Sequence, residues 1–305
     1  VQRMSLYTVA LIACPYNLYD IVTHLLPEYD CAVEETDYGA DVTLTVALPV
    51  LSAMGLECAV LPTAVLSAHT AFEGFRYEPL SLTPVADHWQ QLGLQFDMIY
   101  TGYLGGRAQV DQALDFFTRF PAMRLVDPVM ADHGALYAGL EPDFPAVLRT
   151  LCAQADLITP NITEACLLTG LEYRETHDDS YIRTLLERLL ALGARTAILT
   201  GVRTEPDRVG VACMDAAGAV SQCSAPYVPA VFYGTGDLFA STCAGALTLG
   251  WSVHDAMELA SAYVADTIAE TRREPDARWY GVSFEATIPQ LLRRMAQRRP
   301  SHAEN

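Results

Sequence analysis

Short apolar runs rich in β-branched residues alternate along this chain with longer segments of helical period, and this alternation limits the folds open to it. The clearest predicted strands cover 57–63, 96–102, 123–129, 155–160 and 196–201. Between them, stretches such as RAQVDQALDFFTRF and DSYIRTLLERLLALG repeat apolar residues at the spacing of a helix face. Strands separated by helices indicate stacked βα units, so we expect an α/β fold around a mainly parallel sheet.

After Gly201 the character of the chain changes. The stretch VGVACMDAAGAVSQCSAP alternates across an Asp-Ala-Ala-Gly turn and predicts a hairpin. Two predicted helices follow, near 235–250 and 254–271. The basic run RRMAQRRP lies near the end, and we interpret it as a solvated helix end that leads into a polar tail over 291–305.

The start of the chain offers two candidates for the first strand, LYTVALIAC and DCAVEET. We favour 31–36, because the loop that follows it then falls at the carboxyl end of a strand, where ligands bind in open α/β sheets. On this interpretation residues 1–30 are an N-terminal extension of unassigned role. A single domain then covers 31–290.

Charge and composition exclude several classes of protein. The net charge is −18, so the average surface repels phosphate backbones and we expect no nucleic-acid partner. No window approaches the roughly twenty uninterrupted apolar residues of a membrane helix, and the first residues lack a signal-peptide pattern. We therefore expect a cytoplasmic protein with no membrane partner.

The basic residues are all arginine, and this removes two mechanisms. A Walker-type P-loop needs its lysine, and a pyridoxal-phosphate enzyme needs a lysine for its Schiff base. The eight cysteines are scattered without a C-x-x-C pair, which favours reduced, buried thiols over a zinc site or a catalytic thiol.

The stretch FYGTGDLF places two glycines and a carboxylate at the start of a predicted helix. Gly234 and Gly236 allow turn conformations and close approach to a ligand, while Thr235 and Asp237 begin the helix. The amide hydrogens and the dipole at the start of this helix can then bind a transferring phosphoryl group, and Asp237 can accept a proton from an attacking hydroxyl. An ordinary capping aspartate behind a glycine turn explains the four residues equally well when they are taken alone.

Carboxylates follow neighbouring predicted strands and suit a magnesium ion that accompanies a nucleotide. They are Asp127, Asp132 and Glu164. Each has a structural alternative: Asp127 can end a strand in a turn, and Asp132 can lie on a loop surface. Glu164 can be the capping partner of Asn161 at the next helix.

Six stretches in order resemble the pyridoxal kinase branch of the ribokinase superfamily, most closely bacterial pyridoxamine kinases. The resemblance runs from about residue 36 to 290, and its stretches are LTVALPVLSAMG, LPTAVLSAHT, YTGYLGG, VDPVMADHGALY, ADLITPNITEACLLTG and YGTGDLFAS. It implies a ribokinase-like three-layer α/β/α fold, a homodimer, and ATP and Mg²⁺ as cofactors. A monovalent cation is a further candidate.

The resemblance also implies roles for individual residues. Asp237 corresponds to the catalytic base and Gly234, Thr235 and Gly236 to the anion hole. Asp127 and Glu164 correspond to residues near the metal. The residues that it assigns to the nucleotide side are Asn161, Thr159, Thr200 and Asp132. Those that it assigns to the vitamin pocket and its flap are Asp37, His69, Thr70, Tyr103 and Tyr137. Both tyrosines can instead be core aromatics, and His69 a satisfied loop residue.

Two stretches depart from the family pattern. Relatives carry D-x-S-G-x-G where this chain has EETDYGAD, so Asp37 stands in place of the serine and Ala40 in place of a glycine. A carboxylate there accepts hydrogen bonds only, which favours a protonated pyridine nitrogen or a ring hydroxyl but equally suits altered substrate choice. VMAD also replaces the commoner VMGD and puts a methyl group near the phosphates.

These observations predict an ATP- and Mg²⁺-dependent kinase that phosphorylates the 5′-hydroxymethyl group of pyridoxal, pyridoxamine or pyridoxine. One alternative is a hydroxymethylpyrimidine kinase of the same superfamily, although LSAHT and TGYLGG look more like pyridoxal kinases. Another is a non-catalytic sensor that binds a B6 vitamer or a nucleotide. The divergent loop at 35–41 favours the sensor, and the retained Asp237 opposes it.

Overall fold

The computed structural model describes residues 8–13, 43–66, 76–229, 232–274 and 281–298. Within them, eight strands form one sheet, in the spatial order β12 (Val220–Pro226), β11 (Arg208–Asp215), β10 (Thr196–Val202), β9 (Leu157–Ile158), β6 (Met123–Val126), β5 (Met98–Thr101), β1 (Thr8–Ala13) and β2 (Glu57–Pro62). In this sheet β10, β9, β6, β5, β1 and β2 pair in parallel, and β11 and β12 add an antiparallel hairpin at the β10 edge. The predicted mainly parallel sheet and the hairpin are therefore confirmed.

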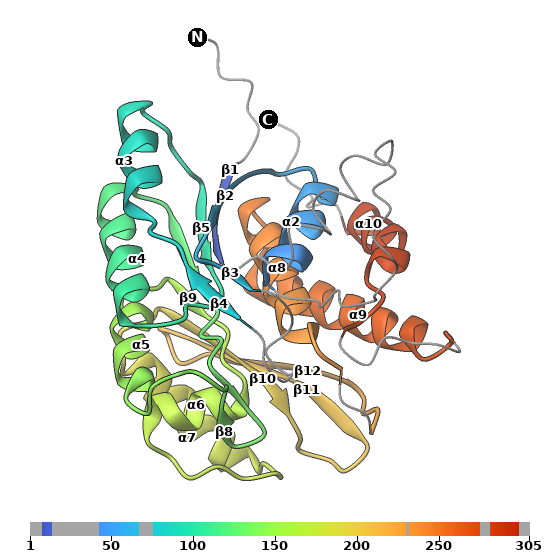
Figure 1. Ribbon diagram of the computed structural model, residues 1–305. Helices are drawn as coiled ribbons and strands as arrows, with labels where there is room; N and C mark the ends of the chain where they lie inside the picture. Colours follow the sequence, from blue (N-terminus) through green and yellow to red (C-terminus); the bar gives the residue numbers. More distant parts are fainter. Residues whose placement is uncertain (1–7, 14–42, 67–75, 230–231, 275–280, 299–305) are drawn as a thin grey trace.

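Helices cover both faces of this sheet (Figure 1). One layer contains α3 (Thr83–Gln91), α4 (Arg107–Arg119), α5 (Phe144–Cys152), α6 (Ile162–Thr169) and α7 (Asp179–Leu190). The other contains α2 (Thr43–Ala53), α8 (Thr235–Thr248), α9 (Val253–Thr271) and α10 (Ile288–Gln297), with the short 3₁₀ helix η1 (Glu285–Thr287) before α10. Each layer packs on its own hydrophobic cluster, so the three-layer α/β/α prediction is also confirmed.

Two short ribbons lie outside the main sheet. One pairs β3 (Ala64–Leu66) with β4 (Tyr77–Pro79), and the other pairs β7 (Ala131–Asp132) with β8 (Ala135–Leu136). In the described part of the chain, no helix is both long and apolar enough to cross a bilayer.

The first strand of the sheet differs from our prediction. Thr8–Ala13 forms β1 and lies between β5 and β2, with Val9 to Ala13 fully buried. A strand in a sheet covered by helices on both faces needs apolar residues on both faces, and VALIA provides them for the two clusters where the charged run at 31–36 does not. Residues 8–13 therefore belong to the sheet and are not part of an extension. The run at 31–36 lies outside the described residues.

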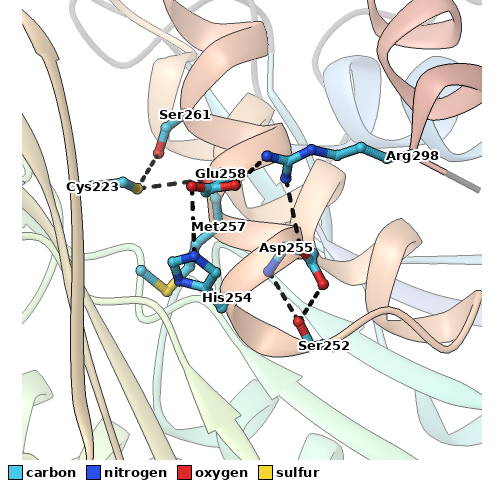
Figure 2. A network of polar contacts seen from close by, with 8 residues as sticks. All are labelled: Cys223, Ser252, His254, Asp255, Met257, Glu258, Ser261 and Arg298. Carbon is cyan, nitrogen blue, oxygen red and sulfur yellow. Dashed lines mark hydrogen bonds and ion pairs between the residues drawn. The ribbon is translucent and has the colours of Figure 1, made fainter. Parts of the chain in front are cut away.

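The C-terminal prediction is also corrected. Residues 291–297 are not a tail, because they belong to α10, whose Leu291 is fully buried against the α8–α9 layer. Figure 2 shows how the end of this helix is held: Arg298 forms ion pairs with Asp255 and Glu258 of α9. Nearby, His254 lies 3.5 Å from Glu258, and Ser252 caps α9 by accepting from the Asp255 amide at 3.1 Å.

Candidate active site

The carboxyl ends of β6, β9 and β10 gather several of the predicted site residues at one edge of the sheet. Asp127 follows β6 and extends its ladder, since its amide donates to the Thr101 carbonyl at 2.9 Å. The Thr159 amide donates to the Val126 carbonyl at 3.1 Å, and Thr200 donates through its amide to Pro160 at 2.9 Å. These bonds fix the backbone of the predicted magnesium and nucleotide residues beside one another.

Helix α8 begins at this edge through the glycine turn that the sequence predicted. Gly234 adopts φ 81°, a left-handed conformation that favours glycine, and its carbonyl accepts from the Leu238 amide at 2.9 Å. Gly236 is exposed, and a Cβ placed on it would meet no heavy atom within 4 Å. The amides of a first helical turn have no acceptor inside their own helix and favour an anion. The open space beside Gly236 leaves room for one.

Asp237 lies in the first turn of α8 and interacts with the residues at the strand ends. Burial raises the pKa of Asp127 well above its ordinary value, and the charges of Glu164 and Asp237 raise it further. The pKa of Tyr137 is likewise raised, first by burial and then by several carboxylates, Asp237 among them. Residues distant in sequence therefore converge into one acidic cluster, which we define as Asp127, Glu164 and Asp237.

Glu164 has a structural role that the sequence offered as an alternative. It is the third residue of α6 and forms a capping box with Asn161: the Asn161 side chain accepts from the Glu164 amide, and the Glu164 carboxylate accepts from the Asn161 amide, both at 2.9 Å. Its other oxygen accepts from the Met130 amide at 3.0 Å. Burial raises the pKa of Glu164 to about 8 despite these bonds, which lower it. Glu164 therefore ties the loop after β6 to the start of α6.

Asn161 completes this tie, because its side-chain amide donates to the Ala131 carbonyl at 2.8 Å. Ala131 itself is fully buried in the core beneath α3 to α7. The methyl group of Ala131 therefore packs inside the protein, and its proximity to the phosphates stays a prediction.

The ribbon of β7 and β8 carries Asp132, which we predicted on the nucleotide side, and leads into Tyr137, which we predicted in the flap. Asp132 is half exposed, and its carboxylate accepts from the His133 amide at 2.8 Å. Tyr137 follows β8, and its amide donates to the Met130 carbonyl at 2.9 Å. The Tyr137 side chain is only partly exposed. Burial and then the charges of Glu164, Asp132, Asp237 and Asp127 raise its pKa, so the half-exposed Asp132 acts on it as well as the acidic cluster.

On the predicted substrate side, the structure describes Tyr103 but not its partners. Tyr103 is 7% exposed and packs with Ala64, Tyr77 and Val129 in a small separate cluster. His69, Thr70 and Asp37 lie outside the described residues.

Gln109 is a residue of this region that our sequence analysis missed. Its side chain is buried and accepts from the Gly105 amide at 2.6 Å and the Tyr77 hydroxyl at 3.0 Å, and it donates to the Thr63 carbonyl. It thereby joins the segments after β2 and β5. A polar residue within the apolar stripe of a predicted helix was the signal that could have identified it.

The donor set fits a magnesium ion held largely by phosphates and water. In the described residues no group of three or more histidine, cysteine, aspartate or glutamate side chains could hold a metal alone. Magnesium in nucleotide sites commonly uses one or two carboxylates together with phosphate oxygens. Asp127 suits that role, since burial and then neighbouring carboxylates raise its pKa, and a cation would relieve the repulsion among these carboxylates.

Comparison with known proteins finds similarity to kinases named for phosphomethylpyrimidine and for pyridoxal. The family model for phosphomethylpyrimidine kinase matches residues 47–277, and a model for a domain of unknown function matches 12–52. A pyridoxine/pyridoxal/pyridoxamine kinase of Bordetella avium is 31% identical over 74% of this chain and 80% of its own length. The pyridoxal kinase of sheep (Ovis aries) is 29% identical over 66% of this chain and 70% of its own.

Solved structures agree with these relatives. Pyridoxal kinase from Lactobacillus plantarum superposes with a TM-score of 0.80 at 33% identity, over 98% of this chain and 100% of its own. A Bacteroides thetaiotaomicron protein described as a phosphomethylpyrimidine kinase and crystallised with pyridoxal gives a TM-score of 0.83 at 30% identity, over 94% and 96% of the two chains. The chain thus belongs to the pyridoxal kinase family of the ribokinase superfamily.

Proposed function

We propose that this protein is a kinase that transfers the γ-phosphoryl group of ATP to the 5′-hydroxymethyl group of a B6 vitamer. The convergence of Asp237, the glycine turn and Asp127 at the start of α8 carries this proposal. The relatives support the activity class, since the Bordetella avium protein is named for all three vitamers.

In the proposed mechanism, Asp237 accepts the proton of the attacking hydroxyl. Its half-buried position in the first turn of α8 sets it beside the donors of the glycine turn, so base and anion site share one rigid element. The amides of Thr235, Gly236 and Asp237 then stabilise charge on the transferring phosphoryl group. Such fixed donors replace the lysine that this chain lacks.

Magnesium bound with ATP would neutralise phosphate charge at the acidic cluster. Asp127 would hold it, directly or through water. Both carboxylate oxygens of Glu164 already accept backbone amides, so we assign Glu164 to holding the Asp127 loop and to acting on the ion by charge. Asn161, Thr159 and Thr200 then border the nucleotide, and the partly buried Tyr137 helps to exclude water from the vitamer.

A hydroxymethylpyrimidine kinase is the second candidate, because the family model that matches residues 47–277 is the one for phosphomethylpyrimidine kinase. The two are separated by an assay of the purified protein with ATP and Mg²⁺, offering pyridoxal, pyridoxamine, pyridoxine and hydroxymethylpyrimidine side by side. We expect ADP release and 5′-phosphate formation with at least one B6 vitamer. Turnover of hydroxymethylpyrimidine alone would reject the proposal, and pyridoxal binding without ADP release would favour the sensor.

The homodimer, the cytoplasmic location and any monovalent cation stay predictions. Light scattering behind size exclusion would test the first, and rates in potassium against tetramethylammonium buffers would test the last.

A further inference from the structure

Among the described residues, Tyr100 and Tyr263 are fully buried between the sheet and α8–α9, and their hydroxyls differ in hydrogen bonding. The Tyr263 hydroxyl donates to the Phe284 carbonyl at 3.0 Å. The Tyr100 hydroxyl has no hydrogen-bond partner among the residues that the structure describes. Because a buried hydroxyl without a partner is unfavourable, packing alone gives no reason for tyrosine over phenylalanine at position 100.

The register of the sheet shows what the Tyr100 side chain faces. Tyr100 pairs with Leu125 in the parallel strands β5 and β6, and both belong to the cluster beneath α8. Asp127 comes two residues after Leu125 on the same ladder, so its side chain leaves the sheet on the same face. Tyr100 and Asp127 are therefore diagonal neighbours beneath the first turns of α8.

Electrostatics agrees with this placement. Burial raises the pKa of Tyr100 well above its ordinary value, and the charges of Asp127, Asp237 and Cys243 raise it further, in that order. The side chain therefore stays a neutral phenol, whose hydrogen is available to a carboxylate acceptor. Among these three groups, Asp127 has the largest electrostatic effect on Tyr100.

We propose that Tyr100 is a positioning residue whose hydroxyl donates a hydrogen bond to the Asp127 carboxylate when nucleotide and Mg²⁺ are bound. This inference rests on the proposed function, because it assigns Asp127 to the ion. The bond holds one carboxylate oxygen from below and leaves the other turned toward the ion. A hydrogen bond to a charged group is strong enough to change the rate about tenfold.

The test compares Tyr100→Phe with Tyr263→Phe as a matched control. For each variant we would measure urea unfolding, the Kd of ADP by calorimetry with and without Mg²⁺, and kcat with the best vitamer. We expect Tyr100→Phe to keep or raise the unfolding midpoint, to bind ADP normally without Mg²⁺, and to lose most of the tightening that Mg²⁺ gives the wild type. Its kcat should fall about tenfold, with the vitamer KM changed less than about twofold.

Tyr263→Phe should do the opposite, lowering the unfolding midpoint while leaving kcat and the Mg²⁺ effect unchanged, because it loses a formed bond to the Phe284 carbonyl and lies on α9, outside the acidic cluster. Equal Mg²⁺ effects in wild type and Tyr100→Phe, or a wild type whose ADP affinity ignores Mg²⁺, would overturn the inference. The binding measurements need no vitamer turnover. An inactive wild type would therefore reject the proposed function and still leave the Tyr100 comparison decisive.

Discussion

Gly236→Ala is a substitution for which the structure predicts opposite effects on stability and on activity. Gly236 lies in the first turn of α8, without the positive φ that Gly234 has, and an added Cβ would touch nothing within 4 Å. Helical Cβ atoms tilt toward the N-terminus, so the methyl group would lean into the space before the first-turn amides. That space is where we place the transferring phosphoryl group.

The expected magnitudes follow from these two facts. Replacing glycine by alanine at a compatible position stabilises a protein by about 0.4–1 kcal/mol, chiefly by restricting the unfolded chain. A phosphoryl group displaced by about 1 Å loses on the order of 100-fold in rate. We therefore expect the free energy of unfolding in urea to stay level or rise, while kcat/KM for ATP falls between about 10- and 100-fold.

Gly218→Ala provides the contrast. Gly218 lies in the turn between β11 and β12 with φ 79° and open space around its Cβ position. Alanine there meets a left-handed backbone, which costs about 1–2 kcal/mol, yet should leave kcat/KM unchanged. Wild-type activity in Gly236→Ala, or a loss of activity matched by a loss of stability, would refute the reasoning about the helix start.

Asp237→Asn should lower kcat by about two to four decades in a coupled ADP-release assay while ADP binding persists, and full activity would remove Asp237 as the base. Burial raises the pKa of Glu164 to about 8 in the folded state, above its unfolded value, so stability is complete at low pH and is lost as pH rises toward 8. Between pH 6 and 8 the unfolding free energy of the ligand-free protein should fall by roughly 2 kcal/mol, and Glu164→Gln should flatten that slope in urea titrations. Leu291→Ala should cost about 2–5 kcal/mol of unfolding free energy, where a residue in a solvated tail would cost almost nothing.

The middle of the fold was predictable because its signals are local. Strands β2, β5, β6, β9 and β10 each follow an apolar run between helical segments, and the parallel sheet follows from that alternation. The glycine turn was predictable for the same reason, since few residues other than glycine adopt the left-handed conformation of Gly234.

The two ends were not predictable from local pattern, because their place depends on pairing across the molecule. The sequence of residues 8–13 is equally compatible with a strand outside the domain. Only its pairing with β2 and β5 places it inside the main sheet. Arginines hid the packed face of α10: Leu291 contacts the core while Arg294 bonds Asp266 at 2.8 and 2.9 Å. Gln109 and Tyr100 escaped notice because a buried polar group is meaningful only once its neighbours are known.

The proposed magnesium site at the acidic cluster would let a protein with a net charge of −18 and no lysine hold a still more acidic nucleotide. Asp127, Glu164 and Asp237 converge in a region that burial desolvates, and each carboxylate that stays charged raises the cost of charging the next. The folded chain carries this repulsion because backbone amides compensate Glu164 and the start of α8 compensates Asp237. In the proposed mechanism, a divalent cation bound with the nucleotide would relieve the remaining repulsion. Binding of metal and nucleotide should therefore be mutually dependent, because neither charge is well accommodated without the other.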